Sequence, residues 1–330
     1  MSFSNHRQSY QNLFCEIAIS AISAIALALP TLALAATNAT TITAAPTGRP
    51  LAIMGPVSGW RQLFNGTDLT GWESYLGAPL PTSNVPNAEK DAQGNYTKPL
   101  GLNNDPLHCF TVVTVDGAPA IRVSGEGYGV LGTKEDFSNY HLRFQFKRGE
   151  KSHAAARAGK PQPPKNGGMI YHAHGDYGVL QGRWMNALQY QICDGSCGAF
   201  IIQGDSTGVI KTRKGGNPKK PVYDPAGDPT TINLAVPECF PAENFEKPIG
   251  EWNTFEIVCV GDKAIHILNG HMVAFAEHLS RATKNADGAT TTEPLTSGRI
   301  QIQMEGAEEY FRNIEIRPAD ETSVKYFDGK

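Results

Sequence analysis

Strict alternation of apolar and polar residues is the sequence feature that most limits how this chain folds. Within residues 140–147, the apolar side chains of Tyr140, Leu142, Phe144 and Phe146 alternate with polar ones. Neighbouring side chains of a β-strand point to opposite faces of a sheet. The pattern therefore predicts an antiparallel strand with one face in the core and the other in solvent.

Further strands follow at regular intervals and are joined by turns that contain glycine. Asn269 and Gly270 both tolerate positive φ, so they predict a tight hairpin turn. We predict strands over residues 169–172, 188–193, 255–260, 264–268, 299–305 and 310–317. Regularly spaced strands without long helical patterns predict an all-β fold, a two-sheet antiparallel β-sandwich. We expect one domain over residues 56–320 and a C-terminal tail over residues 321–330.

The N-terminus carries the features of a secretory signal peptide. A long apolar run covers residues 17–36, and Ala-Leu-Ala at residues 33–35 has the small-x-small form of a cleavage site. We expect residues 1–35 to be removed on export to the periplasm or the extracellular space, followed by a flexible lead-in over residues 36–55. In the alternative, the run stays as an uncleaved anchor of about 20 residues, and only then is a membrane a partner.

The charge balance argues against nucleic acid as a partner. The chain has 29 Lys and Arg against 32 Asp and Glu, a formal charge of −3, whereas a nucleic-acid binder needs a basic footprint. Residues 211–220 concentrate five cations. This segment is either a contact for an anion or a polysaccharide, or a solvated loop, which is the usual fate of a block of like charges.

Cysteine usage fits an exported protein. Of six cysteines, Cys15 would leave with the signal peptide, so an odd number remains. Cys193 and Cys197 lie close enough in the sequence to pair around a Gly-Ser turn. No second cysteine or histidine pair has matching spacing, so we do not expect a structural zinc site.

Several segments, taken together, resemble the 3-keto-disaccharide hydrolase domain family. The matching segments are residues 59–72 (GWRQLFNGTDLTGW), 132–140, 166–172 (NGGMIYH), 250–255, 266–270 and 310–314 (YFRNI). The resemblance spans about residues 59–317. It implies a concanavalin-like, laminin-G-like β-sandwich and a substrate that is a glycoside oxidised at C3 of the sugar.

The chain departs from this family at one position that matters for chemistry. The family's central strand usually reads Glu-x-Gln-x-x-Asp, and here it reads Gln189-x-Gln191-x-x-Asp194. A carboxylate that moves a proton or binds a metal is therefore missing at residue 189. The departure either weakens catalysis or transfers the role to His172, His174 or Asp194.

The ketone that the resemblance implies defines the chemistry of the site. A C3 ketone acidifies the C2–H bond, so a base takes that proton while the glycosidic oxygen leaves, and water then adds to the enone. Donors or a cation would stabilise the enolate oxygen. We predict that pairing of two neighbouring strands gathers His172, Gln191 and Asp194 as the catalytic group. The alternatives are structural: a hydrated loop edge for the histidines and an Asx-turn for Asp194.

A divalent metal ion is the one cofactor that we consider for this site. Because His172 and His174 are two residues apart, they share one face of a strand. Neutral imidazole is a common metal ligand. The ligand set that we predict is His172, His174 and Asp194.

We expect the substrate-binding residues to include aromatic and amide side chains. Trp72, Trp184 and Arg183 are candidates because aromatic rings stack on sugars and Arg donates to sugar oxygens. Asn166 and Gln189 complete the set. For Trp72 the alternative is a core anchor, since large aromatic residues dominate core burial.

Two other functions compete with the hydrolysis of 3-keto-glycosides. The same sandwich fold serves non-catalytic carbohydrate-binding modules, and the glutamine at residue 189 favours that reading. A conventional glycosidase needs two carboxylates at about 5–9.5 Å. The chain has no Glu-x-Asp-x-Glu run, so we rank this function last.

Overall fold

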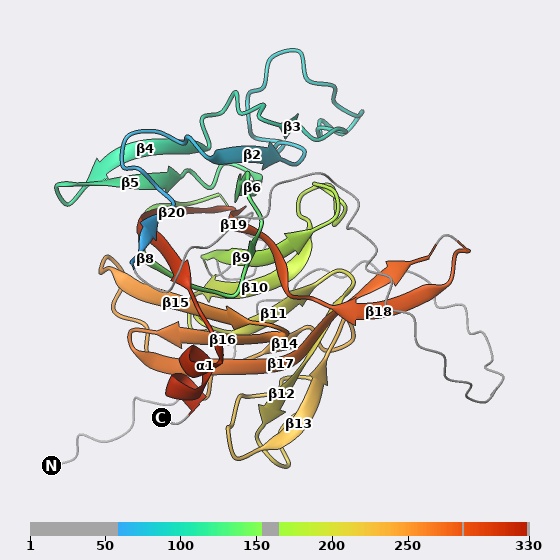
Figure 1. Ribbon diagram of the computed structural model, residues 1–330. Helices are drawn as coiled ribbons and strands as arrows, with labels where there is room; N and C mark the ends of the chain where they lie inside the picture. Colours follow the sequence, from blue (N-terminus) through green and yellow to red (C-terminus); the bar gives the residue numbers. More distant parts are fainter. Residues whose placement is uncertain (1–58, 154–164, 286, 329–330) are drawn as a thin grey trace, which may run out of the picture. The chain divides into compact units, whose positions relative to one another are not determined.

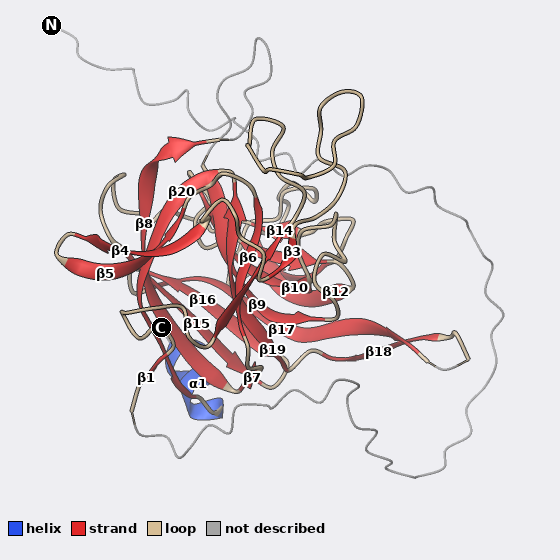
Figure 2. Ribbon diagram, turned by 90° about the horizontal axis from the view of Figure 1, so that it is seen from above, coloured by secondary structure: helices blue, strands red, loops and turns tan. Residues whose placement is uncertain are grey.

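The computed structural model describes residues 59–153, 165–285 and 287–328 (Figure 1). The predicted signal peptide and lead-in, residues 1–35 and 36–55, lie outside the described residues. Within the described ranges, no helix is both long and apolar enough to cross a membrane. The regular secondary structure of the described chain is β-strand, apart from one short C-terminal helix, α1 (Glu321–Asp328) (Figure 2).

The strands form two antiparallel sheets, which confirms the predicted sandwich. The eleven-stranded sheet has, in spatial order, β13 (Asp228–Ile232), β12 (Ser206–Thr212), β17 (His271–Lys284), β16 (Lys263–Leu268), β15 (Asn253–Val260), β8 (Tyr140–Ser152), β20 (Ala307–Pro318), β5 (Ala118–Val123) and β4 (Phe110–Val115), with β1 (Arg61–Gln62) on β20 and β18 (Thr290–Pro294) on β17. The nine-stranded sheet has β14 (Glu238–Cys239), β11 (Phe200–Gln203), β10 (Asn186–Cys193), β9 (Asn166–His174), β19 (Ser297–Glu305), β6 (Tyr128–Thr133), β2 (Trp72–Leu76) and β3 (Gly101–Leu102), with β7 (Phe137–Ser138) on β19.

Aromatic side chains from both sheets fill the space between them. Phe144 and Phe146 of β8 pack against Phe255 of β15 with ring centroids 5.4 and 5.5 Å apart. Tyr190 of β10 stacks on the same Phe255 ring at 4.9 Å. All four side chains have no exposed surface. Burial of such large apolar surfaces is the main stabilising contribution to a sandwich of this kind.

The structure corrects three details of the sequence prediction. Strand β8 continues to Ser152, beyond the alternating pattern of residues 140–147. The expected C-terminal tail contains helix α1. Cys193 and Cys197 are both buried and do not form the disulfide that their spacing allows.

The segment between β9 and β10 packs on the outer face of the nine-stranded sheet, the side that faces away from the other sheet. It contributes Tyr177, Leu180, Trp184 and Met185 to an apolar cluster on that face. The strands contribute Tyr75, Tyr128, Val130, Ile170, Ala173 and Ala187 to the same cluster. The polar residues described next share this outer face.

Candidate active site

A row of glutamines lies on the outer face where β10, β9 and β19 run side by side. Leu188, Tyr190 and Ile192 of β10 point into the core, so alternation directs Gln189 and Gln191 outward. On β9, Gly168 pairs with Gln191 on one side and with Gln303 of β19 on the other. A Cβ at Gly168 would lie 2.7 Å from Gln189 Nε2 and 2.9 Å from Gln303 Oε1. The glycine therefore leaves room for side chains of β10 and β19 to meet above β9.

These side chains form a hydrogen-bonded chain that ends on a carboxylate. Gln203 Nε2 donates to Gln189 Oε1, and Gln189 Nε2 donates to Gln191 Oε1. Gln189 Nε2 also donates to Gln303 Oε1 at 2.8 Å, and Gln303 Nε2 donates to Glu305 Oε2 at 3.0 Å. We call Gln189, Gln191, Gln203 and Gln303 the glutamine network. Because Gln189 and Gln303 are almost fully buried, their bonds fix the rotamers of the chain that orients Glu305.

Glu305 is the acid at the accessible end of this network. Its side chain is half-buried at the end of β19. Burial raises the pKa of Glu305 to about 7, and the nearby Arg183 guanidinium opposes that shift. A carboxyl group with a pKa near neutral suits general acid–base catalysis, because both protonation states are populated at the operating pH.

Arg183 and two aromatic rings lie beside Glu305. The Arg183 guanidinium carbon is 4.0 Å from the ring centroid of Tyr128 and 5.7 Å from that of Trp184. Tyr128 is the strand partner of Glu305 across β6 and β19. The indole Nε1 of Trp184 is buried and makes no hydrogen bond within the described chain. Aromatic rings bind a sugar through its apolar faces, and a guanidinium binds its oxygens.

Asn166 lies at the same end of the outer face. It pairs with Cys193 of β10, and its neighbour Gly167 pairs with Met304 of β19. This register brings Asn166 level with Glu305. Asn166 alternates with Gly168, so it shares the outer face, and it is half-buried. Of the predicted substrate-binding residues, Asn166, Arg183, Trp184 and Gln189 thus lie on one face, with Gln189 inside the glutamine network.

His172 lies in the sandwich core and does not face this site. Its ring contacts Tyr140 and Tyr171 edge-on, at 5.7 and 5.6 Å, and has no exposed surface. Burial, followed by the effect of His174, lowers the pKa of His172 to about 3, so the ring is neutral at ordinary pH. Gln191 pairs with Gly168, which lies four residues before His172 on β9. Gln191 and His172 are therefore separated by ~13 Å along the strand direction.

Asp194 is also separated from Gln191. Its carboxylate pairs with Arg148 Nε at 2.9 Å and accepts a hydrogen bond from the Lys165 backbone at 3.1 Å. The Arg148 side chain is 2% exposed and lies on the inner side of β8. The prediction that His172, Gln191 and Asp194 share one pocket is therefore wrong, because the three side chains point to different regions.

The predicted metal ligands do not converge either. The two ring nitrogens of His174 lie 2.9 Å from the His172 carbonyl and 2.8 Å from Asp205 Oδ1, so both are engaged. Among the described residues, no three His, Cys, Asp or Glu side chains gather as a metal site. The predicted set of His172, His174 and Asp194 does not fit a metal ion, and we derive no step through one.

Trp72 is a core anchor and not a sugar-stacking residue. It is 4% exposed and belongs to the main hydrophobic cluster. Its indole Nε1 donates to the Leu63 carbonyl at 2.8 Å. Of the two alternatives considered for Trp72, the structural one is confirmed.

Replacement of His172 by Asn is expected to affect stability and leave turnover per folded molecule within about twofold. Asn also tolerates the positive φ of 49° at this position. Loss of the buried ring is expected to lower the free energy of unfolding by about 2–4 kcal/mol, measured by urea denaturation. His278→Asn is the matched control, because His278 has a φ of 54° and an exposed ring. A variant that loses activity at unchanged stability would contradict a structural role for His172.

Sequence reasoning overlooked Glu305 and Tyr128 as site residues. The signal for Glu305 was present, because Ile300, Ile302 and Met304 alternate with it and point inward. What the pattern lacked was the identity of the neighbouring strands.

The sequence model of one protein family, the 3-keto-alpha-glucoside-1,2-lyase-like domain, matches residues 59–317. No curated protein matches the chain. A crystal structure of a protein assigned to the glycosyl hydrolases, from Parabacteroides distasonis, is 20% identical, covers 79% of this chain and 94% of its own, and has a TM-score of 0.42.

Two further solved structures are more distant. The carbohydrate-binding module CBM66 from Bacillus subtilis is 10% identical over 63% of this chain and 91% of its own, with a TM-score of 0.36. LamAcat from Zobellia galactanivorans is 11% identical over 79% of this chain and 94% of its own, with a TM-score of 0.37. Since the family model covers nearly all of both sheets, the chain belongs to the 3-keto-alpha-glucoside-1,2-lyase-like domain family.

Proposed function

We propose that this protein cleaves the glycosidic bond of 3-keto-glycosides, with Glu305 as the base that takes the C2 proton. Membership of the family supports a carbohydrate-active sandwich domain. The observation that carries the finer proposal is the position of Glu305. It is a half-buried acid with a pKa raised to about 7, oriented by Gln303 and next to Arg183.

The proposed reaction is an elimination followed by hydration. Glu305 accepts the C2 proton, and the electrons of the C2–H bond form the C1=C2 double bond as the C1–O bond breaks. The leaving oxygen takes up a proton from water, which balances the proton held by Glu305. Addition of water across C1=C2 then gives the free 3-keto sugar, so the net reaction is hydrolysis.

The groups around Glu305 supply recognition and charge stabilisation. In this proposal the Arg183 guanidinium donates to the C3 oxygen, on which negative charge develops when the C2 proton leaves. Tyr128 and the exposed edge of Trp184 contact the apolar face of the sugar ring. Asn166 provides a second polar contact at the same level.

Gln189 and Gln191 act through Glu305 in this proposal. Both are almost fully buried, at 3% and 2% exposure, so they serve to position other groups. The acid that the family carries at residue 189 is replaced here by an acid on β19, linked to residue 189 through Gln303. We also propose that the chain is exported by its N-terminal segment, so that it meets its glycoside substrate outside the cytoplasm.

The test is the comparison of a 3-keto-glucoside with its unoxidised parent. We expect turnover of the ketone only, because without the C3 carbonyl the C2 proton is not acidic enough for Glu305 to remove. Substitution of deuterium at C2 is expected to slow the reaction if proton removal limits the rate. Equal turnover of both glucosides would overturn the proposal. Binding of the ketone without any turnover would favour the alternative, a non-catalytic carbohydrate-binding module.

A further inference from the structure

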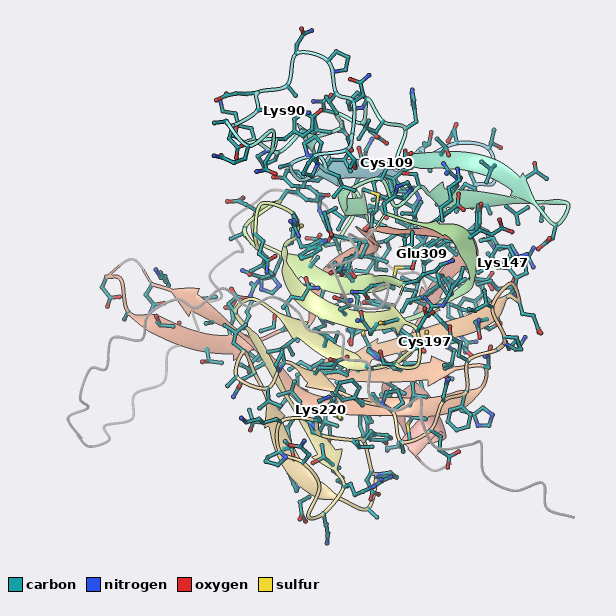
Figure 3. The ribbon with its side chains drawn as sticks, turned by 180° about the vertical axis from the view of Figure 1, so that it is seen from behind. Lys90, Cys109, Lys147, Cys197, Lys220 and Glu309 are labelled. Atoms are coloured by element: carbon teal, nitrogen blue, oxygen red, sulfur yellow. The ribbon has the colours of Figure 1, made fainter. Side chains whose placement is uncertain are left out.

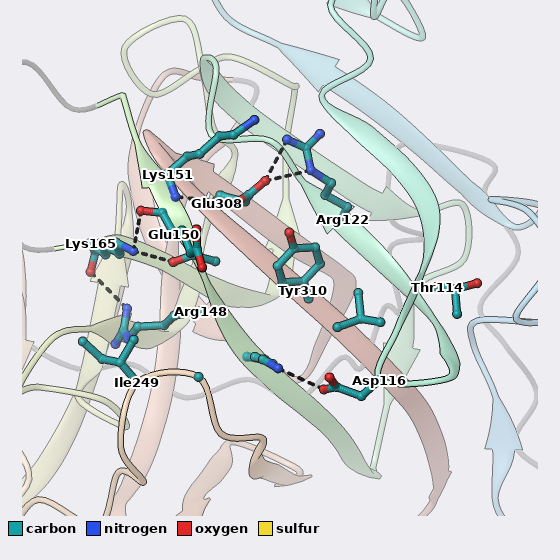
Figure 4. Close-up of a pocket in the computed structure, with 14 residues that line it drawn as sticks. Thr114, Asp116, Arg122, Arg148, Glu150, Lys151, Lys165, Ile249, Glu308 and Tyr310 are labelled. Atoms are coloured by element: carbon teal, nitrogen blue, oxygen red, sulfur yellow. Dashed lines mark hydrogen bonds and ion pairs between the residues drawn. The ribbon is translucent and has the colours of Figure 1, made fainter.

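We propose that a second site, on the outer face of the eleven-stranded sheet, binds a carboxylate-bearing oligosaccharide such as an oligouronide. The site is a cavity with a volume of about 1080 Å³ (Figure 4). It lies over strands β4, β5, β8 and β20, and the loop that contains Ile249 and Gly250 forms one side of it.

The lining of this cavity is positively charged. Five cationic residues border it against three acidic ones, Asp116, Glu150 and Glu308. The cationic residues are Arg122, Lys147, Arg148, Lys151 and Lys165. The chain as a whole is slightly acidic, so this local excess of positive charge is a property of the site. An excess of this sign attracts anionic ligands and raises their local concentration.

Most of these cations already have partners, and two of them remain available to a ligand. The Lys147 ammonium binds Asp116 at 2.9 Å, and Arg148 turns inward to Glu246. Lys151 is exposed, and no described acidic side chain lies within ion-pair distance of its ammonium group. Arg122 binds Glu308 through Nε and one Nη and also interacts with the Tyr310 hydroxyl, yet its side chain is still 23% exposed.

Lys151 and Arg122 lie close to each other at one end of the cavity. Figure 4 shows their side chains on either side of Glu308, with Tyr310 directly beside them. Glu308 holds the guanidinium in place, and its carboxylate neutralises only one of the two cations. A ligand carboxylate next to Lys151 and Arg122 would complete the charge balance through charge-assisted hydrogen bonds.

The size of the cavity and its other lining groups favour a sugar chain as the ligand over a single small anion. A volume near 1080 Å³ is slightly above the range of about 300–1,000 Å³ for small-molecule sites. The half-buried ring of Tyr310 and the exposed side chain of Ile249 add surfaces that suit the apolar faces of sugar rings. An inorganic anion would use none of these surfaces.

This site is independent of the proposed active site. Phe144 and Phe146 of β8 and Phe311 of β20 point into the core. Lys147 directly follows Phe146 and Tyr310 directly precedes Phe311, so both point to the outer face of the eleven-stranded sheet. Glu305 lies on the outer face of the other sheet. The two faces are separated by the hydrophobic core, and each can therefore be tested without the other.

The experiment is calorimetric titration of the full chain with tetragalacturonate, maltotetraose and inorganic phosphate. We expect tetragalacturonate to bind, more weakly as salt is added, and maltotetraose and phosphate to bind at least about tenfold more weakly. Lys151→Glu is expected to weaken tetragalacturonate binding by about tenfold or more. Lys151→Ala, which removes the charge without reversing it, is expected to give a smaller loss in the same direction.

Lys219→Glu is the matched control, because Lys219 is an exposed lysine of the basic segment 211–220. It makes the same change of charge away from the cavity, and we expect no change in binding. Equal effects of the variants at Lys151 and Lys219 would overturn the proposal, as would phosphate binding as tight as that of tetragalacturonate. Glu305→Gln is expected to leave tetragalacturonate binding unchanged, so failure of this proposal is distinguishable from failure of the proposed active site.

Discussion

Replacement of Glu305 by Gln is expected to slow turnover of a 3-keto-glucoside by about 10²- to 10⁴-fold, the usual contribution of a positioned general base. Glutamine keeps the size of the side chain, and its amide oxygen still accepts the hydrogen bond from Gln303. The change therefore removes the basic group while the glutamine network stays in place. The measurement is kcat and kcat/KM, together with KM as a check that substrate still binds.

The pH profile of the unmodified protein tests the same assignment. Burial raises the pKa of Glu305 to about 7, and only the ionised carboxylate accepts a proton. We therefore expect kcat/KM to rise with pH through about 7 and to level off above it.

Glu293→Gln is the matched control for Glu305→Gln. Glu293 lies on β18 and pairs with Arg281, away from the outer face that holds Glu305. It is expected to leave turnover unchanged. Turnover by Glu305→Gln within about threefold of the unmodified protein would remove Glu305 from the mechanism.

Replacement of Glu309 by Gln is expected to protect the fold at alkaline pH. Glu309 is 1% exposed and points into the sandwich, where a Cβ on Gly167 would overlap its carboxylate (Figure 3). Neither carboxylate oxygen accepts a hydrogen bond within the described chain. Burial raises the pKa of Glu309 to about 8, an effect that Arg148 only partly opposes.

The sign of the pH dependence follows from this shift. The unfolded chain releases the Glu309 proton near pH 4.5 and the folded chain near pH 8, so the folded state holds more protons between these values. The free energy of unfolding therefore falls as pH rises through this window, by up to about 4–5 kcal/mol for this group. A glutamine stays neutral throughout and lacks this loss.

The measurement is urea denaturation at a series of pH values from about 4.5 to 9. As the pH rises across this series, the free energy of unfolding of Glu309→Gln is expected to increase by several kcal/mol relative to that of the unmodified protein. Glu293→Gln again serves as the control, because its half-exposed carboxylate is expected to add little pH dependence. Parallel stability curves for Glu309→Gln and the unmodified protein would show that Glu309 ionises in the folded state as it does in the unfolded chain.

The β-bulge at His172 explains why the predicted catalytic group does not form. Simple alternation from Asn166 and Gly168 puts residue 172 on the outer face of β9. His172 instead has a φ of 49°, and the register between β9 and β19 shifts there. One extra residue reverses the faces beyond it, so His172 enters the core and Ala173 takes the outer face. No sequence pattern in this segment signals the shift.

Long-range strand pairing decided the rest of the site. Gln189 and Gln303 are 114 residues apart in the chain and meet only because β9 lies between β10 and β19. Period-two alternation predicts that each faces outward, yet it does not say which strands are neighbours. The same limit hid the pairing of Tyr128 with Glu305.

Local patterns alone therefore determined the all-β class, most strand positions, the hairpin turn at Asn269-Gly270 and the inward or outward direction of residues in regular strands. These properties depend on the backbone geometry of a few consecutive residues. The tertiary structure alone decided which outward residues come together, which strands bulge and which acids are buried. Those outcomes depend on contacts between distant segments, where packing and desolvation act and where no short stretch of sequence contains both partners.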